Sequence, residues 1–338
     1  MEIRGGQSRY DVINYLKGFS IITIVLMHLI QNYNVIGIID KVSSLGGTGV
    51  HIFFFCSGFG LYLSQRKKEL SYFEFLKSKF FKIYIPYIIV VLIIAIVPFT
   101  FDGSFNERIS ALASHLLLYK MFIPEFEGSF SYPLWYMSTL FQFYLVFVVL
   151  YKVKKIISVR LFAAICFLIS CAWWIITGMT VLGTERIWYS FFLQYLWEFA
   201  IGMCLAEKLY NNETIKIKTV YLLPIAIFGL AIGGVLGSMG GVLKSFNDCF
   251  LAVGYGGIAL VIYRFVKPYR SLCEKICEFS YEWYLTHATC FLIIKKMLAA
   301  RLPVQGFATV LSMTVSLLLS VVVAVVYHKL IRTLMKRL

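Results

Sequence analysis

Apolar runs of about twenty residues recur along the whole sequence, and short basic stretches separate them. A helix of that length spans the hydrocarbon core of a bilayer, which is about 30 Å thick. Hydrophobic residues make up 60% of the chain and charged residues 14%, whereas soluble domains average about 45–50% and 25%. The sequence therefore predicts an all-α, polytopic bundle of transmembrane helices, with residues 1–338 forming one integral membrane domain, and disfavours a soluble globular fold.

The pattern gives ten candidate spans. They lie near residues 13–33, 47–64, 83–101, 131–151, 161–179, 188–206, 219–236, 248–266, 279–298 and 306–328. Placing the N-terminus in the cytoplasm puts 24 of the 32 lysines and arginines in cytoplasmic segments and leaves 8 outside. By the positive-inside rule, this asymmetry predicts that both termini are cytoplasmic. Because the net charge of +15 is distributed between the spans, a nucleic-acid partner is not expected.

The longest segment predicted to lie outside covers about residues 102–130. Helical periodicity from Ile109 to Phe122 indicates an amphipathic helix lying on the membrane surface. We expect His115, which lies within this stretch, to be a surface or interface residue.

The first candidate span carries two ionisable residues on one helix face. His28 follows Lys17 by eleven positions, a rise of about 16 Å and a rotation that returns to within about 20° of the same face. The stripe links a cation at the cytoplasmic end to an imidazole near mid-membrane. We predict that His28 and Lys17 are catalytic, because a neutral imidazole serves as a general base on a hydroxyl near neutral pH. The alternative is a histidine that only bonds to a neighbouring helix.

The entries to the second and third spans carry further candidates. Lys79 and Lys82 are three residues apart, which places them on one face at the start of the third span. We predict that they bind an anionic group such as a phosphate of a cofactor, the alternative being cytoplasmic anchoring. His51 opens the second span after a glycine-rich stretch and is a candidate for a second titrating group near the outer surface.

Later spans supply candidate substrate-binding residues. Trp135, Gln142 and Tyr144 in the fourth span fit either the wall of a sugar-binding cleft or an interface belt with helix–helix hydrogen bonds. Glu198 is an acid within the sixth span, where it must meet a cation, a hydroxyl or water. His287 opens the ninth span as a further buried histidine. We assign these five residues to the substrate site.

The eight cysteines are spread over many spans and form no predicted disulfide framework. Cys273 and Cys277 lie one helical turn apart, but no second ligand pair accompanies them. We therefore expect no metal site and interpret these cysteines as structural.

Five strings keep a fixed order along the chain. They are Lys17-Gly18 with His28, Gly49-Val50 with Phe53-Phe54 and Ser57-Gly58-Phe59, Lys79 with Lys82 and Pro86, Leu134-Trp135 with Gln142-Phe143-Tyr144, and Ser280-Tyr281 with Tyr284-Leu285 and His287. Together they resemble the acyltransferase-3 family of integral membrane O-acyltransferases over nearly the whole chain. Lysine replaces the family's arginine at the three basic positions, which keeps the charge but loses the bidentate fork toward phosphate. The chain thus looks like the lysine-bearing subgroup that modifies polysaccharides and sugars. Leu140 and Phe141 stand where many members carry acids, so no role is carried over for those acids.

The resemblance implies a membrane O-acetyltransferase in a bacterial inner (plasma) membrane. Acetyl-CoA is the implied cytoplasmic donor, with no cofactor permanently bound, and a glycan hydroxyl is the implied acceptor, free or lipid-linked, beside membrane lipid. His28 would act as the base toward that hydroxyl or carry the acetyl group transiently. Lys17, Lys79 and Lys82 would hold the CoA phosphates or polarise the thioester carbonyl.

Two other readings remain open. Ten spans with buried histidine, lysine and glutamate also suit a transporter or flippase of a lipid-linked glycan or a small anionic substrate, although no inverted repeat is visible. A sensor or assembly partner with vestigial catalytic residues is the third reading. The acceptor, the acyl length and the oligomeric state are not specified by the sequence.

Overall fold

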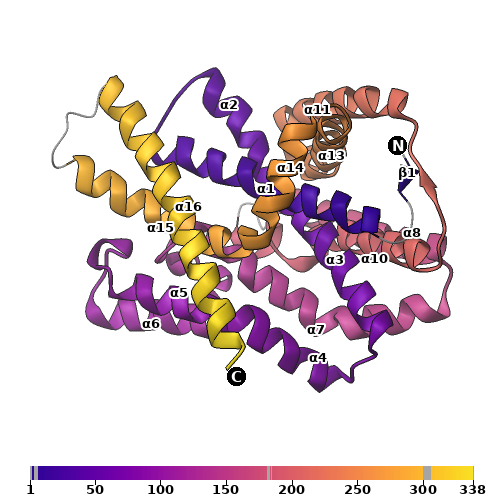
Figure 1. Ribbon diagram of the computed structural model, residues 1–338, viewed down its shortest axis with the longest axis horizontal. Coiled ribbons are helices and arrows are strands. Elements are labelled where there is room, and N and C mark those ends of the chain that lie inside the picture. Colours follow the sequence, from indigo (N-terminus) through magenta and orange to yellow (C-terminus); the bar gives the residue numbers. More distant parts are fainter. Residues whose placement is uncertain (1, 4–6, 181–182, 184, 300–305, 338) are drawn as a thin grey trace. The chain divides into compact units, whose positions relative to one another are not determined.

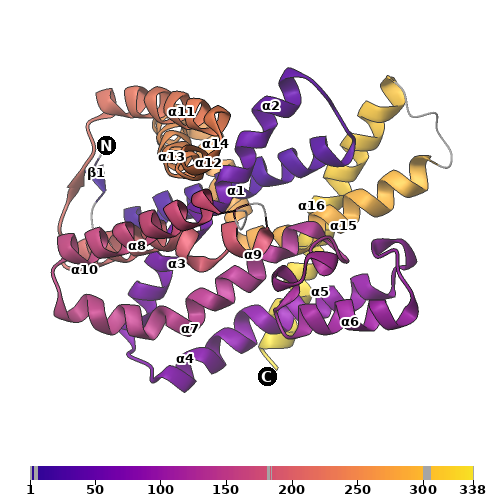
Figure 2. The same ribbon diagram turned by 180° about the vertical axis from the view of Figure 1, so that it is seen from behind.

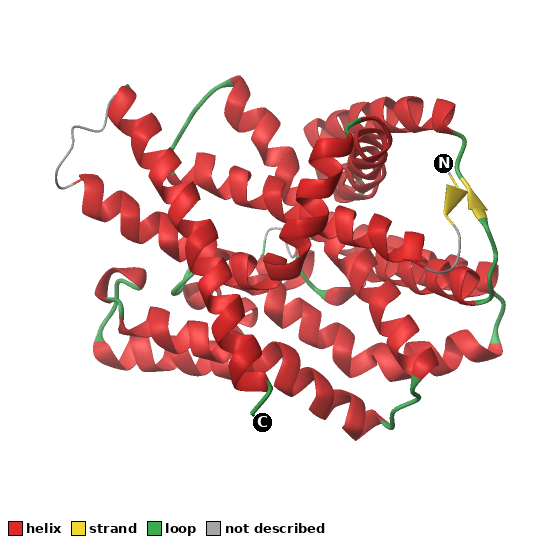
Figure 3. Cartoon of the chain, viewed as in Figure 1, coloured by secondary structure: helices red, strands yellow, loops and turns green. Residues whose placement is uncertain are grey.

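The computed structural model describes residues 2–3, 7–180, 183, 185–299 and 306–337, and helices dominate it (Figure 3). Its described strands, β1 (Glu2–Ile3) and β2 (Ile215–Lys216), form one short antiparallel pairing. The α-helices are α1 (Gln7–Asn32), α2 (Ile38–Ser44), α3 (Gly49–Lys67), α4 (Tyr72–Lys79), α5 (Ile85–Ile96), α6 (Phe105–Leu116), α7 (Trp135–Ile156), α8 (Val159–Met179), α9 (Arg186–Tyr189), α10 (Leu196–Tyr210), α11 (Leu222–Met239), α12 (Gly241–Ser245), α13 (Asn247–Phe265), α14 (Lys267–Ile276), α15 (Ser280–Ala299) and α16 (Phe307–Met335). The predicted all-α class is confirmed.

Eight helical segments in the described part of the chain are long and apolar enough to cross a membrane, by length and composition. They are Asp11–Asn32, Ile38–Lys67, Tyr72–Ile96, Tyr132–Ile156, Val159–Met179, Thr219–Met239, Gly241–Phe265 and Phe307–Met335. The protein is a multi-pass membrane protein, as its sequence predicts. The cytoplasmic placement of both termini stays a prediction.

Two of the ten expected spans are not among these eight segments. The span expected at 188–206 is divided, because α10 has only 15 residues and follows the separate short helix α9. The span expected at 279–298 is helical as α15, but this helix carries Glu282, Lys295 and Lys296. Charges lower the apolar character that a lipid-exposed span needs.

The third span begins earlier than expected. It starts with α4 at Tyr72, passes through one π-helical turn at Phe80–Tyr84 and ends with α5 at Ile96. It ends there because Pro98 disfavours helical geometry at Val97, which adopts an extended conformation. Lys79 and Lys82 therefore lie inside a continuous helix, at its π-turn, and not at its start as the sequence predicted.

The chain divides into two compact units whose segments alternate along the sequence. Unit 1 comprises Met1–Ser20, Thr48–Phe73 and Thr139–Cys277, and unit 2 comprises Ile21–Gly47, Glu74–Ser138 and Glu278–Leu338. Helices α1, α4 and α7 each contribute residues to both units. Organisation as one integral membrane domain stays a prediction.

Unit 1 is built on two pairs of helices in close contact. α11 lies beside α13 in both views (Figures 1 and 2), and α3 packs along α10. Lys154 of α7 and Glu207 of α10 form an ion pair of 2.5 Å in which the lysine side chain is almost fully buried. The buried lysine requires this partner, because a buried charge without an ion-pair partner lowers the stability of the fold.

Unit 2 is organised around α15, which packs against α16 and α5. The indole nitrogen of Trp283 donates to Ser320 Oγ at 3.0 Å and joins α15 to α16. The hydroxyl of Tyr327 on α16 donates to the carbonyl of Pro86 at 2.6 Å and joins α16 to α5. The α15 helix thus packs against two helices, α16 and α5, which are also joined to each other by a hydrogen bond.

The predicted amphipathic helix is present in unit 2 as α6, but it is shorter and begins earlier than expected. It starts at a capping box formed by Ser104 and Glu107 and ends at Leu116. His115 is fully buried, so the expectation of a surface residue is wrong. Its Nε2 donates to Ser129 at 3.0–3.2 Å, and its Nδ1 accepts from the hydroxyl of Tyr87 at 3.0 Å. These partners could not be predicted from the sequence, because both lie on other segments.

Burial, with a smaller effect of the Lys120 charge, lowers the pKa of His115 well below its ordinary value of 6.5. Below that ordinary value the unfolded chain binds a proton that the folded protein does not, so stability falls as the pH falls. We expect thermal unfolding in detergent to show a larger loss of stability between about pH 7.5 and about pH 5.5 for the wild type than for His115→Gln. An equal pH dependence of the two proteins would contradict this assignment.

Candidate functional site

Unit 2 brings together two histidines that are 259 positions apart in the sequence. Nδ1 of His28, on α1, lies 2.8 Å from Nε2 of His287, on α15. The rings are nearly parallel, with centroids 5.1 Å apart. His287 is 0% exposed, whereas His28 is half-buried. The structure therefore pairs the predicted catalytic histidine with a residue that the sequence assigned separately to the substrate site.

The backbone of α15 fixes the direction of this hydrogen bond. Nδ1 of His287 lies 2.9 Å from the carbonyl oxygen of Trp283 and 2.8 Å from that of Tyr284. Because carbonyl oxygens only accept, Nδ1 of His287 carries the proton, and Nε2 of the neutral ring is the acceptor. His28 must then donate from Nδ1. A neutral His28 consequently has an unprotonated Nε2.

That second nitrogen of His28 is available for chemistry. Within the part of the chain that the structure describes, Nε2 of His28 has no hydrogen-bond partner. An imidazole with one nitrogen held by an orienting group and the other free is the arrangement of a general base or of a nucleophilic nitrogen.

The helix that carries His287 is anchored close to this pair. Tyr281 donates to the carbonyl of Ile83 at 2.6 Å, and Tyr284 donates to the carbonyl of Pro133. The ring of Tyr136 packs edge-on against Tyr284, with centroids 5.2 Å apart. These contacts explain the aromatic residues between Ser280 and His287 in structural terms. Tyr281 and Tyr284 fix the rotation of α15 about its axis.

Unit 1 contains a second buried histidine with a partner. Nδ1 of His51, on α3, donates to Oε1 of Glu198, on α10. Tyr195 lies edge-on to the imidazole, with ring centroids 5.1 Å apart. Both paired side chains are buried. The sequence required a partner for Glu198 and named His51 as a titrating group, but it gave no signal that joined the two residues.

Glycines allow the close approach of helices α3 and α10 that forms this pair. A Cβ on Gly58 of α3 would lie 2.1 Å from the carbonyl oxygen of Phe199, and a Cβ on Gly202 of α10 would lie 2.1 Å from that of Phe55. Neither position has room for a larger residue. Gly58 of α3 and Gly202 of α10 thus allow the short distance between His51 and Glu198.

The predicted basic residues belong to both units. Lys17 is half-buried in the part of α1 that belongs to unit 1. It precedes Gly18, where an added Cβ would lie 1.9 Å from the carbonyl oxygen of Cys273. In unit 2, the Lys79 ammonium lies over the ring of Phe75 at 5.1 Å, and Lys82 is exposed. No hydrogen bond or ion pair joins Lys79 or Lys82 to the histidine pair among the described residues. Their role in binding an anion stays a prediction.

The predicted sugar-binding residues on α7 fall into different surroundings. Trp135 is half-buried in unit 2, edge-on to Tyr136. In unit 1, Oε1 of Gln142 accepts a hydrogen bond from the backbone of Phe192 at 3.1 Å, and Tyr144 is buried. Sugar binding by these residues stays a prediction, and the bond made by Gln142 also gives it a structural role.

No group of three or more potential metal ligands occurs among the residues that the structure describes. Cys273 is buried at the contact with Gly18, and the thiol of Cys277 lies 3.7 Å from Oδ1 of Asn14. These contacts agree with packing roles for the two cysteines.

Eight candidate spans and a buried pair of histidines characterise this multi-pass membrane protein. Residues 10–329 match the family model described as an acyltransferase domain. The chain belongs to this family, the acyltransferase-3 family that its five strings resemble. This membership confirms the predicted family and supports the predicted class of enzyme, an acyltransferase.

The chain is also similar to a curated protein, acyltransferase MdmB of Streptomyces mycarofaciens. The two are 33% identical over 127 residues, which cover 35% of this chain and 32% of MdmB. The chain thus matches about a third of the length of that relative. No solved structure matches the chain.

The close approach of α3 and α10 yields a testable prediction. We expect Gly58→Ala to lower the free energy of unfolding by about 1–3 kcal/mol, because its methyl group meets the α10 backbone. Gly60→Ala on the same helix is the matched control, since its Cβ would meet nothing within 4 Å. Thermal unfolding of both variants in detergent measures the difference. Equal stabilities would show that the helices tolerate a wider separation.

Proposed function

We propose that this protein transfers an acetyl group from cytoplasmic acetyl-CoA to a hydroxyl of a cell-surface or secreted glycan, in the inner membrane of a bacterial cell. The observation that carries the proposal is the hydrogen bond from His28 to His287, which leaves Nε2 of His28 unprotonated. Membership of the acyltransferase-3 family supports acyl transfer as the reaction class.

In the proposed reaction, Nε2 of His28 takes the proton of the acceptor hydroxyl as its oxygen attacks the thioester carbonyl. The C–S bond breaks, an ester forms, and the departing thiolate takes the proton back from His28, so that free CoA leaves. During this step, Nδ1–H of His28 keeps donating to His287, which stabilises the transient imidazolium. In the second version of the mechanism, Nε2 attacks the thioester carbonyl, the C–S bond breaks and the CoA thiolate leaves. The hydroxyl oxygen then attacks the acetyl carbon, the N–C bond breaks, and the hydroxyl proton passes by way of His28 to the thiolate, so that the ester and free CoA form.

The remaining predicted residues enter the proposal as binding groups. Lys17, Lys79 and Lys82 supply positive charge for the CoA phosphates or the thioester carbonyl, and Trp135, Gln142 and Tyr144 supply contacts for the acceptor sugar. His287 and Glu198, which the sequence assigned to the acceptor, have partners that favour positioning roles in addition.

The first prediction concerns the base itself. We expect His28→Ala to reduce acetyl transfer by about 100-fold or more, because a positioned general base contributes about that much. Membrane vesicles supplied with radiolabelled acetyl-CoA, followed by counting of the isolated glycan fraction, measure the transfer. Leu26→Ala, at an exposed position on the same helix, is the matched control and retains transfer. Label in the glycan with His28→Ala would refute the role of His28. No label with the wild-type protein and an adequate glycan pool would favour transport, for which vesicle uptake is the assay.

The second prediction concerns the hydrogen bond that orients His28. We expect His287→Phe to lower kcat by about tenfold or more with little change in KM for acetyl-CoA, since it removes only the acceptor for Nδ1–H. His287→Gln retains an acceptor oxygen and recovers part of kcat. Equal loss in both variants, or a change confined to KM, would indicate that His287 serves packing or substrate binding instead.

A further inference from the structure

A cavity of about 670 Å³ lies in unit 1, lined by the end of α8, by α12, by the start of α13 and by residues between α8 and α10. Sites for small molecules have volumes of roughly 300–1,000 Å³. The described residues that line this cavity are glycines and residues with polar side chains, and no purely hydrocarbon side chain is among them. The cavity therefore has the size of a ligand site and the wall of a hydrophilic one.

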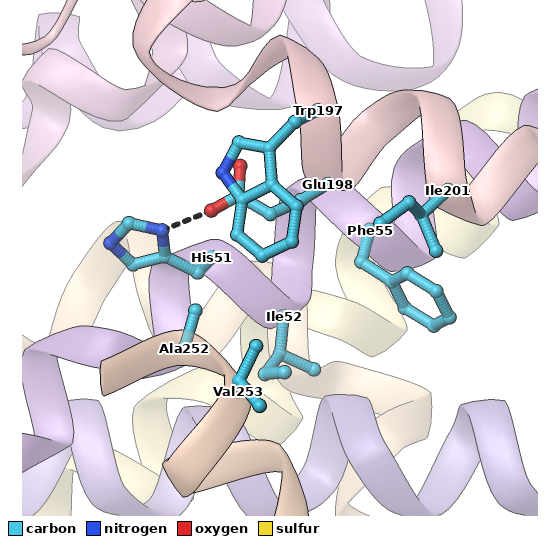
Figure 4. Close-up of a pocket in the computed structure, with 8 residues that line it drawn as sticks. All are labelled: His51, Ile52, Phe55, Trp197, Glu198, Ile201, Ala252 and Val253. Atoms are coloured by element: carbon cyan, nitrogen blue, oxygen red, sulfur yellow. Dashed lines mark hydrogen bonds and ion pairs between the residues drawn. The ribbon is translucent and has the colours of Figure 1, made fainter. Parts of the chain in front are cut away.

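The cavity beside the pair of His51 and Glu198 differs in both respects (Figure 4). Its volume is about 110 Å³, and Ile52, Phe55 and Ile201 form much of its wall. A molecule with many hydroxyl groups would lose hydrogen bonds to water on such a wall without replacing them. Of these two cavities, only the larger suits a hydrophilic ligand.

The larger cavity extends from the surface into the protein. Thr180 and Lys244 are exposed, whereas Thr177 and Gln194 are only 3% and 5% exposed. Exposed residues at one end and buried residues at the other give the cavity an open rim and an enclosed floor. A ligand that enters here thus leaves bulk water and must exchange its hydrogen bonds for those of the wall.

Two hydrogen bonds from α7 hold the segment that supplies part of the floor. The hydroxyl of Thr139 donates to the carbonyl of Ser190 at 2.6 Å. Oε1 of Gln142 accepts from the backbone N–H of Phe192 at 3.1 Å. Gln194 follows two residues later in the same segment. Gln142, which the sequence assigned to the substrate, therefore positions a residue of this cavity.

Glycines keep the backbone around the cavity close together and uncovered. A Cβ on Gly178 of α8 would lie 2.6 Å from Oγ of Ser245 on α12, so the two helices touch at this point. Gly240 and Gly241 turn the chain between α11 and α12 with φ of 76° and 53°, which glycine adopts without strain. All three glycines line the cavity and leave its volume free of side chains.

The polar groups on the wall are of every hydrogen-bonding kind. Asp248 offers acceptors, Lys244 offers donors, and the side chains of Gln194, Asn247 and Ser245 offer both. Nε2 of Gln194 donates to Oδ2 of Asp248 at 3.3 Å, which fixes the direction of the amide because a carboxylate only accepts. A ligand with several hydroxyl groups, each both donor and acceptor, matches this mixture.

The charges on the wall favour a neutral ligand. Lys244 and Asp248 carry opposite charges and are four positions apart. An anionic ligand would be repelled by Asp248 and a cationic one by Lys244, whereas a neutral molecule meets neither penalty. Tyr189 adds an aromatic ring to the lining, on which the C–H face of a sugar ring can pack.

The predicted topology places this cavity on the side where surface glycans lie. With the N-terminus in the cytoplasm, the span that ends at Met179 crosses from the inside to the outside. The cavity is lined directly beyond that end, by Thr180 and Tyr189 among others.

We propose that this cavity binds a neutral sugar unit of the acceptor glycan. Its hydroxyl groups donate to Asp248 and accept from Lys244 and Gln194. This inference rests on the proposed function, because it assigns to the cavity the acceptor of that reaction. Binding of the sugar itself requires neither His28 nor an acetyl donor, so it is measured separately.

Saturation-transfer difference NMR, which detects ligand protons in contact with a protein, tests the site. The full chain is reconstituted in phosphatidylcholine nanodiscs without acetyl-CoA and without sugar-based detergent. We expect signals from one or more of glucose, galactose, mannose, rhamnose and N-acetylglucosamine, and weaker ones from the charged analogues glucuronate and glucosamine. Absence of signals from all the neutral sugars overturns the proposal. Stronger signals from a charged analogue overturn its preference for neutral ligands.

Matched variants locate the binding. Thr180→Trp fills the rim at an exposed position and should abolish the signals, whereas Met179→Trp should not, since Met179 is 72% exposed and does not line the cavity. Asp248→Asn keeps an oxygen for Gln194 but removes the charge, so it should weaken sugar binding by about tenfold. Undiminished signals in Thr180→Trp overturn the site, and undiminished binding in Asp248→Asn overturns the contact with Asp248.

The radiolabel assay in vesicles then tests whether the bound sugar belongs to the acceptor. We expect Thr180→Trp to raise KM for the glycan and to leave KM for acetyl-CoA unchanged, with Met179→Trp equal to the wild type. Normal transfer by a Thr180→Trp protein that no longer binds sugars would overturn the acceptor role. Loss of transfer in His28→Ala with sugar binding intact separates the two proposals, because only the first concerns the reacting group.

Discussion

The need to pair every polar side chain buried among apolar helices governs the arrangement of this protein. An imidazole or carboxylate in such surroundings has lost its water, and only a hydrogen bond from another side chain or the backbone compensates. His287 meets this need through the carbonyls of its own helix, which leaves its second nitrogen to receive His28. Glu198 meets it through His51, and Lys154 through Glu207. The polar pairs thus specify which helices must be neighbours.

Small residues make these pairings geometrically accessible. The carbonyl of Phe199 approaches so closely to Gly58 that a single methyl group would collide with it, and this contact lies on the same two helices as the pair of His51 and Glu198. In unit 2 the hydroxyls of Tyr281 and Tyr284 hold α15 in position by donating hydrogen bonds to backbone carbonyls of other segments. Packing and polar pairing therefore depend on each other: neither pair would form if the helices were separated by one more side-chain layer.

The sequence predicted the helices far better than it predicted their partners. Hydropathy is a local property, so the eight apolar spans could be predicted from it. The role proposed for His28 followed from its position within one of these spans. The pairing of His51 with Glu198 bridges 147 positions, and the pairing of His28 with His287 bridges 259, distances at which a single sequence has no pattern to join them. The sequence also did not predict the burial of His115, because its partners Tyr87 and Ser129 lie on other segments. The spans expected at 188–206 and 279–298 are not among the eight candidate segments, because a break precedes α10 and charged residues lie on α15.

The two histidine pairs differ in their partners. The partner of His28 is an imidazole whose own Nδ1 proton is held by backbone carbonyls, so its Nε2 accepts the hydrogen bond from Nδ1 of His28. The partner of His51 is the carboxyl group of Glu198, whose Oε1 accepts the hydrogen bond from Nδ1 of the imidazole. Buried pairing thus joins helices in both units, once through two imidazoles and once through an imidazole and a carboxyl group.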